Sequence, residues 1–254
     1  MAIRRYDDLV ERLRKIATSP SVELAPIGEF EAGGKAYPLF YLLMGSPGPN
    51  KKSVMIGAGI HGDEPGGVEA AVRFLEHNAA NHKLLSRFVF TVFPCNNPSG
   101  WERNTRENAD GIDLNRQFNA RKPAAEAAII SQALQGKRFD LLFEMHEDVD
   151  SPGFYMYEIA NDPSTYLGEK IIEAVESAGC PINRNECIER MPANGGLIRR
   201  RVIRFRKTRL PLAIYAHRTC GGHVLTLEPP ASMLSLEERV AVELMGLSIA
   251  LDCS

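Results

Sequence analysis

The feature that most constrains this chain is an apolar run that breaks into a cluster of polar residues. Residues 54–67 read VMIGAGIHGDEPGG, and the stretch Val54–Ile60 has the apolar character of a buried strand. The run is followed by His-Gly-Asp-Glu and then by Pro65, a residue suited to the first position of a helix. His61 and Glu64 therefore lie between a strand and a helix, three residues apart, where their side chains can converge on one point.

This pair has the chemistry of a partial metal site. A histidine and a glutamate are two of the three protein ligands that a catalytic zinc ion requires, with the fourth position open for water. The pattern HxxE is short, and by itself a polar loop with one histidine explains it better. A third ligand elsewhere in the chain is needed to favour a metal site.

Segments of strand and helix character alternate along the chain. This alternation predicts an α/β sandwich with a mostly parallel or mixed sheet. No internal repeat or linker interrupts it, so a single domain over residues 1–254 is expected. Strands are expected at residues 22–30, 35–44, 54–60, 88–93, 139–145 and 223–227, helices at residues 4–17, 67–77, 123–134, 164–177 and 234–251, and irregular structure between residues 178 and 222.

Polar residues follow the carboxyl ends of several apolar strands. They are His61, Asn96, His146 and Glu228. In open α/β sheets, ligands bind at that edge. His146 directly follows the strand run LLFEM, so it is the best candidate for the third zinc ligand, because a buried strand delivers it to the same edge as His61.

A carboxylate beside the metal would complete a hydrolytic site. Zinc lowers the pKa of its bound water towards ~7, and a neighbouring carboxylate can accept the proton. Glu228 suits this role because VLTLE is an apolar strand with a single acid at its exit. On local grounds alone, a glutamate that begins a turn before Pro229 explains the pattern equally well.

The segment Arg103–Phe118, RNTRENADGIDLNRQF, contains groups that a transition state needs. Attack on a carbonyl develops an oxyanion, which a guanidinium such as that of Arg106 can stabilise. A substrate carboxylate is held well by an arginine with an amide beside it, which Asn115 and Arg116 would supply. Asp113 could accept a hydrogen bond from the outer nitrogen of a ligand histidine and fix its tautomer.

Together these motifs resemble those of the zinc metallocarboxypeptidase (funnelin) family. The resemblance rests on HGDE, the RxNxxGxDLNR pattern, the later strand-end histidine and the final TLE strand, in that order between residues 54 and 228. It implies a compact bacterial-type member, related to the branch of succinylglutamate desuccinylase and aspartoacylase. It also implies the fold of the family, a phosphorylase/hydrolase-like three-layer α/β/α sandwich around a twisted mixed, mostly parallel sheet of about eight strands.

The resemblance also implies one zinc ion per chain and a role for each motif residue. It matches His61, Glu64 and His146 to the zinc ligands, Glu228 to the general acid/base, Arg106 to the arginine that polarises the scissile carbonyl, Asn115 and Arg116 to the pair that grips the C-terminal carboxylate, and Asp113 to the partner of the first histidine.

Two further residues depart from the family pattern. Arg103 competes with Arg106 for the role at the carbonyl. Tyr215 is the nearest match to the mobile substrate-binding tyrosine of the family, but it lies closer to Glu228 than the family usually shows. A core or surface role explains Tyr215 better.

A basic stretch precedes the proposed catalytic glutamate. Between Met191 and Leu227 the chain has no Asp or Glu. A solvated basic loop explains this stretch, and the alternative is a rim that attracts anionic substrates, such as peptides ending in Glu or Asp. Its basic residues are Arg199, Arg200, Arg201, Arg204, Arg206, Lys207, Arg209 and Arg218.

The composition indicates which kinds of partner and which cellular compartment to expect. A net charge of -2 argues against a general nucleic-acid or membrane binder. Five scattered cysteines without a CxxC pair indicate a reducing compartment. The N-terminus lacks the apolar core of a secretion signal, so a cytoplasmic protein is expected. The oligomeric state is left open.

The favoured function is a zinc carboxypeptidase that acts on the C-terminal residues of peptides or peptide-like amides. A close alternative is an N-acyl-amino-acid amidohydrolase, similar to aspartoacylase and succinylglutamate desuccinylase. An inactive relative that keeps zinc as a binding module would not need an intact Glu228. A two-metal aminopeptidase would need additional carboxylates such as Glu147, Asp148 and Asp150, which solvated loop acids explain better.

Overall fold

One eight-stranded sheet runs through the computed structural model, which describes residues 4–199 and 207–254. Its strands are β1 (Val22–Ala32), β2 (Lys35–Met44), β3 (Lys52–Ala58), β4 (Phe88–Phe93), β5 (Leu141–Met145), β6 (Tyr155–Ile159), β9 (Leu197–Arg199) and β10 (His223–Glu228), while β7 (Cys187–Ile188) and β8 (Met191–Pro192) form a separate pair. The order in the sheet is β1-β2-β4-β3-β5-β10-β6-β9.

The middle of the sheet is parallel and its flanks are mixed. β4, β3, β5 and β10 pair in parallel, whereas β2 joins β4 and β6 joins β10 in antiparallel fashion. β1 extends β2 as a hairpin whose turn contains Gly33 and Gly34, both at positive φ. The mixed sheet of about eight strands that the resemblance implied is therefore confirmed.

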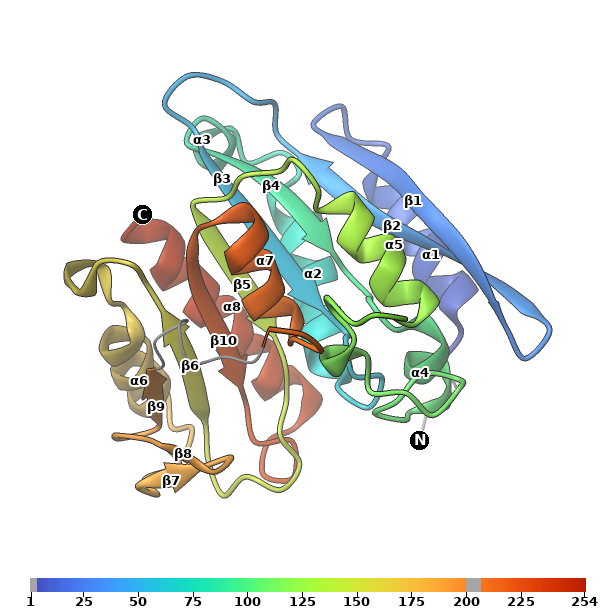
Figure 1. The fold of residues 1–254 in the computed structure, drawn as a ribbon. Coiled ribbons are helices and arrows are strands. Elements are labelled where there is room, and N and C mark those ends of the chain that lie inside the picture. The colour runs from blue at the N-terminus through green and yellow to red at the C-terminus, as the bar shows by residue number, and fades with distance from the viewer. Residues whose placement is uncertain (1–3, 200–206) are drawn as a thin grey trace.

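Helices cover both faces of the sheet and give the expected three layers (Figure 1). The helices are α1 (Tyr6–Ile16), α2 (Pro65–Asn78), α3 (His82–Leu85), α4 (Pro98–Arg103), α5 (Ala125–Ala133), α6 (Gly168–Ser177), α7 (Leu212–Cys220) and α8 (Leu236–Asp252), with 3-10 turns at Leu114–Arg116 and Pro163–Thr165. α5 and α7 lie on the face towards the viewer of Figure 1, and α2 and α8 lie behind the sheet.

Two apolar cores separate these layers. Along β5, Leu141, Phe143 and Met145 pack with residues of α1, α2, α6 and α8. Leu142 points to the other side and packs with residues of α5 and α7. The central strands are thus buried on both faces, and that burial explains why they appear in the sequence as continuous apolar runs.

Two elements near the site were missed by the sequence analysis. β6 was not predicted, and the expectation of irregular structure between residues 178 and 222 is wrong for α7. α7 has nine residues, and isolated helices this short are unstable in water. Burial of Leu212, Ile214 and Ala216 in the core below it supplies the missing stability.

The parallel strands end together at one edge of the sheet. Met145 at the end of β5 is in register with Ala58 of β3 and with Leu227 of β10. The residues that directly follow these strands therefore meet at this edge, which is where the sequence predicted a ligand site.

Two observations bear on the expected compartment. None of the helices among the described residues combines the length and apolar character needed to cross a lipid bilayer. All five cysteines are free thiols. The cytoplasmic location itself remains a prediction.

Candidate metal centre

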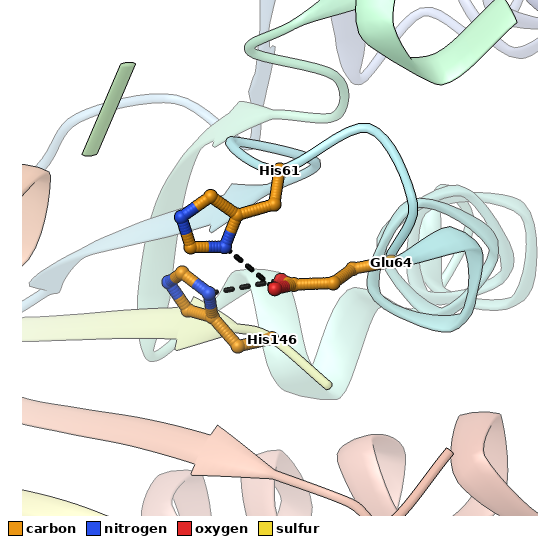
Figure 2. Close-up of side chains that lie close together, drawn as sticks. All are labelled: His61, Glu64 and His146. Atoms are coloured by element: carbon orange, nitrogen blue, oxygen red, sulfur yellow. Dashed lines mark hydrogen bonds and ion pairs between the residues drawn. The ribbon is translucent and has the colours of Figure 1, made fainter. Parts of the chain in front are cut away.

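Three side chains from distant parts of the chain converge just beyond this edge (Figure 2). Glu64 Oε1 lies 2.5 Å from His61 Nδ1, and Glu64 Oε2 lies 2.9 Å from His146 Nδ1. One ligand atom from each residue lies within 4.8 Å of the other two, and all three residues are buried. The three residues predicted to bind zinc are therefore brought together.

The backbone around β3 and β5 explains this convergence. A Cβ atom at Gly62 would lie 2.0 Å from the carbonyl carbon of Gly100, so only glycine lets this loop pass so close to α4. Glu64 directly precedes α2, which aims its side chain back at the end of the sheet. His146 follows β5, and its N–H donates a hydrogen bond of 3.1 Å to Leu227 O at the end of β10.

The charges in this cluster support one another. Burial opposes the ionisation of Glu64, but the neighbouring imidazoles outweigh burial and lower its pKa to about 2. Burial likewise opposes the charging of His61, but Glu64 and Asp113 outweigh it and raise the imidazole pKa to about 9. The carboxylate and imidazolium groups therefore hold the site together, and a metal ion that binds here must displace protons from the imidazoles.

Asp113 and Arg106 surround the first histidine. Asp113 Oδ1 lies 3.5 Å from His61 Nε2, slightly beyond a good hydrogen bond. Arg106 spans the two acids, with Nη1 3.6 Å from Glu64 Oε1 and Nη2 3.7 Å from Asp113 Oδ2. The Arg106 side chain is 43% exposed, so its guanidinium also faces the solvent from which a substrate would enter.

This donor set fits zinc. Two imidazole nitrogens and one carboxylate are a known ligand set of catalytic zinc. Both Nδ1 atoms face Glu64, so a shared ion would leave Nε2 of His61 turned towards Asp113, as a ligand histidine with an outer carboxylate partner requires. Nε2 of His61 is buried, and Asp113 Oδ1 at 3.5 Å is the acceptor towards which it points.

Comparison with known proteins finds similarity to one family. A family model described as zinc carboxypeptidase matches residues 17–140, which contain two of the three zinc-ligand candidates. Murein peptide amidase A of Escherichia coli, from strain K12 and from O157:H7, is 36% identical over 78 residues. This match spans 30% of the present chain and 29% of the length of that relative. Residues 17–140 are therefore similar to the zinc carboxypeptidases.

Solved structures named as metallopeptidases or carboxypeptidases share the fold over nearly the whole chain. A candidate metallopeptidase from Shewanella amazonensis superposes with a TM-score of 0.79 at 21% identity and covers 97% of this chain and 91% of its own. A metallo-carboxypeptidase from Burkholderia cenocepacia has a TM-score of 0.72 at 21% identity over 98% of this chain and 69% of its own. Carboxypeptidase A from Helicoverpa armigera has a TM-score of 0.72 at 16% identity over 99% and 73%. These likenesses confirm the fold.

Glu228 ends β10 and interacts electrostatically with the candidate ligands Glu64 and His146. Burial raises the pKa of Glu228 to about 8. His146 opposes the shift, Glu64 and Asp148 add to it, and Arg106 opposes it weakly. Glu228 is therefore an acid whose pKa lies close to neutral pH and which lies within electrostatic reach of two candidate ligands.

Asn115 and Arg116 lie in the turn that follows Asp113. Asn115 is buried, and its Oδ1 accepts a hydrogen bond of 2.8 Å from the N–H of Leu212. The side-chain NH₂ is then the group that Asn115 can offer to a ligand. Arg116 is half-buried, and its Nη1 donates to Asn115 O at 2.8 Å. Asp113 accepts a bond of 2.8 Å from the Asn115 N–H, so the turn is tied to the metal centre.

Arg103 and Tyr215 are not brought to the ligand cluster. Arg103 ends α4, and its guanidinium lies beside Gly33 in the β1–β2 turn and donates to Ala109 O at 3.3 Å. Tyr215 lies in α7 with its ring centroid 5.6 Å from that of Phe118, against the apolar core. Of the two arginines, Arg106 is the one that lies beside the ligand cluster.

The basic stretch and the number of metal sites were also predicted from the sequence. Arg200, Arg201, Arg204 and Arg206 of the basic stretch lie outside the described residues. Among residues 4–199 and 207–254, the one group able to hold a metal ion is the His61, Glu64 and His146 cluster.

The carboxylates expected of a two-metal site have other surroundings. Glu147 lies 3.1 Å from Arg239 Nε, and Asp148 accepts a hydrogen bond of 2.9 Å from the Tyr155 hydroxyl. Asp150 is exposed. These contacts give the three acids no shared site.

One buried acid close to the centre escaped the sequence analysis. Glu144 lies in β5 two residues before His146 and is 1% exposed. Burial raises the pKa of Glu144 to about 7, against a weaker opposing effect of His146. The signal was present in the sequence, because LLFEM places a single acid inside an otherwise apolar strand.

Proposed function

We propose that this protein is a zinc-dependent hydrolase that removes C-terminal residues from peptides or peptide-like amides. The observation that carries the proposal is the convergence of His61, Glu64 and His146, with Arg106 and Glu228 facing the same point. Zinc held by these three ligands would supply an activated water and polarise the substrate carbonyl. The kinship with zinc carboxypeptidases supports the same reaction class.

The side chains of this chain provide the other parts of an amide hydrolysis. As a carboxylate, Glu228 can accept a proton from the attacking water and then deliver it to the leaving amine, and its raised pKa favours holding that proton between the two steps. Arg106 can stabilise the negative charge that develops on the carbonyl oxygen. The NH₂ group of Asn115 and the guanidinium of Arg116 can bind the free carboxylate of the substrate.

An N-acyl-amino-acid amidohydrolase is the second candidate, because it needs the same metal, acid and carboxylate-binding groups. The name of the matched relative, murein peptide amidase A, favours a peptide-like amide and adds murein peptides to the substrates to be tried. The RxNxxG sequence before DLNR also favours the peptide.

The basic stretch supports a peptide with a net negative charge as the substrate, a property separate from the side chain of its last residue. Arg199, Lys207 and Arg209 flank the undescribed residues 200–206. A basic rim would act at long range, so its effect on kcat/KM should follow the net charge of the peptide and weaken as salt increases. If kcat/KM depended on salt equally for acidic and neutral peptides, the basic stretch would have no role in substrate attraction.

Metal analysis beside a substrate panel tests the function. Elemental analysis of the purified protein should find one zinc per chain, and blocked dipeptides should be hydrolysed faster than N-acetyl and N-succinyl amino acids. The opposite ranking would favour the amidohydrolase, and two zinc ions per chain would favour an aminopeptidase. Stoichiometric zinc without turnover of any amide, murein peptides included, would contradict the proposal and leave a zinc-keeping binding module.

A further inference from the structure

We propose that Glu144 determines substrate specificity by binding a cationic side chain on the C-terminal residue of the substrate. This inference deepens the proposed function and rests on it for the placement of that residue. It assigns a role to a buried acid that the hydrolytic chemistry described above does not use.

Glu144 belongs to a polar row that crosses four strands. In register it pairs with Gly57 of β3 on one side and with Thr226 of β10 on the other. Thr226 in turn lies opposite Tyr157 of β6. Side chains at paired positions share one face of a sheet, so the carboxylate, the hydroxyl and the phenol form one line.

This row lies between the apolar core and the catalytic residues. Two residues earlier along β5 and β10, Leu142 and Val224 point to the same face and belong to the core under α7. Two residues later come His146 and Glu228, at a distance of about 6–7 Å along the strands. The polar row is therefore the first layer of side chains beneath the catalytic groups.

The groups proposed to bind the substrate carboxylate lie on the same side of the sheet as this row. α7 packs over β5 and β10, and its first N–H, from Leu212, is bonded to Asn115 Oδ1. A terminal residue whose carboxylate is held by Asn115 and Arg116, with its amide carbonyl at Arg106, would direct its side chain towards the row. Tyr157, which is partly exposed, marks the open end of that row.

The space for the carboxylate is made by a missing side chain. A Cβ atom at Gly57 would lie 2.5 Å from Glu144 Oε2, a distance that real atoms do not adopt. Any other residue at position 57 would thus displace the acid. Glycine in the middle of a buried strand weakens that strand, so its presence here favours a role for what occupies the space.

One oxygen of this acid has no hydrogen-bond partner in the part of the chain that the structure describes. Glu144 is 1% exposed, and its Oε1 has no hydrogen-bond partner among the described residues. Buried carboxylates are ordinarily paired or bonded, as Glu126 is to Asn108 at 3.0 Å. An ammonium or guanidinium from the substrate would complete the interaction that the protein leaves open.

Matched peptides that differ only in a terminal charge provide the test. Blocked dipeptides ending in lysine or in norleucine have side chains of similar length, and only lysine is charged. We expect the zinc-loaded protein to favour the lysine peptide by about 10-fold or more in kcat/KM, the range of a charge-assisted hydrogen bond. Glu144→Gln should remove most of that preference, and Glu144→Asp, which keeps the charge, should retain it. High salt should change the preference little, which separates it from any effect of the basic stretch.

A second buried acid supplies the control. Glu243 of α8 is fully buried and belongs to the opposite layer, where it lies near the backbone of His146 and not in the polar row. Glu243→Gln removes a similar charge, and the ratio between the two peptides should stay at the wild-type value. Zinc content and melting temperature measured for each variant report on whether it folds.

Binding of the products separates this inference from the proposed function. Calorimetry with free L-lysine and L-norleucine should show tighter binding of lysine to the wild type and a smaller difference for Glu144→Gln. Lysine binding that depends on Glu144 would support the inference even if no amide were hydrolysed. Hydrolysis of both peptides with a ratio that Glu144→Gln leaves unchanged would overturn the inference and leave the hydrolase intact.

Discussion

The two ends of strand β10 hold buried acids in opposite ways. At its beginning, His223 Nε2 lies 3.0 Å from Oε1 of Glu158, an acid in β6 whose side chain is 0% exposed. Arg199 Nη2 donates to Glu158 Oε2 at 2.8 Å and also contacts Glu169, and the Leu167 N–H donates to Glu158 Oε1 at 2.6 Å. Every oxygen of Glu158 thus has a partner.

At the other end of β10, the acids are left with few partners. Burial raises the pKa of Glu228 to about 8 and that of Glu144 to about 7. Glu158 is as deeply buried, but its hydrogen bonds outweigh burial and lower its pKa. The difference shows that burial alone does not set the charge of an acid in this sheet. Hydrogen bonds fix the charge at one end, and their scarcity leaves the other end able to exchange protons.

The largest expected effect comes from neutralising Glu228. Glu228→Gln should lower kcat/KM by about 10²-fold or more, because the proton acceptor of the reaction is lost. Zinc content should be unchanged, since His61, Glu64 and His146 remain. The free energy of unfolding should be unchanged or higher, because a poorly paired buried acid is replaced by a neutral group. Steady-state kinetics, elemental analysis and urea unfolding measure the three quantities.

The same type of substitution beside the beginning of β10, Glu158→Gln, should lower stability and leave activity almost unchanged. Glu158→Gln leaves the partly exposed Arg199 and His223 without their shared carboxylate, and it should lower the free energy of unfolding by about 2–3 kcal/mol. That value is below the cost of breaking a fully buried pair, because solvent screens Arg199. The effect on kcat/KM at 25 °C should stay within about threefold, since Glu158 touches no proposed catalytic group. A large loss of activity with unchanged stability would contradict the comparison between the two ends.

Much of the site could be predicted because its residues lie in short motifs at the ends of apolar strands. HGDE, DLNR and the strand-end His146 and Glu228 can each be found as a short pattern in the sequence, and their occurrence together pointed to the site. The parallel register of β3, β5 and β10 then brings them to one edge, and this register follows from the fold class. The alternation of strands and helices predicted the α/β sandwich with a mixed sheet, and the family resemblance added the number of strands.

What could not be predicted depends on contacts between segments far apart in sequence. Glu158 is one acid in YMYEI, and nothing local to it reveals that Arg199 and His223 will meet it. α7 owes its existence to the core beneath it. Glu144 was visible as an acid in an apolar strand, but its space depends on Gly57, a partner 87 residues earlier.

The smallest expected effect is a pH dependence of stability that arises at the beginning of β10, where Glu158 is hydrogen-bonded. Burial opposes the ionisation of Glu158, but hydrogen bonds from His223, the Leu167 N–H and Arg199 lower its pKa below the ordinary 4.5. A lowered pKa in the folded state means that the stabilisation is complete above pH 4.5 and is lost as the pH falls through the lowered value. Glu169, which also contacts Arg199, has a lowered pKa and adds to the same decline.

Glu158→Gln measures how much Glu158 contributes to this loss of stability at low pH. The melting temperature of the wild type should fall more steeply below pH 4.5 than that of the variant, so that the gap between the two proteins narrows as the solution becomes more acidic. Glu228→Gln should keep the wild-type slope in this range, because the pKa of Glu228 is raised and the acid is already protonated there. A difference in melting temperature between wild type and Glu158→Gln that stays constant from pH 6 to pH 3 would mean that the charge of Glu158 does not contribute to stability. Packing alone would then explain the stability of the beginning of β10.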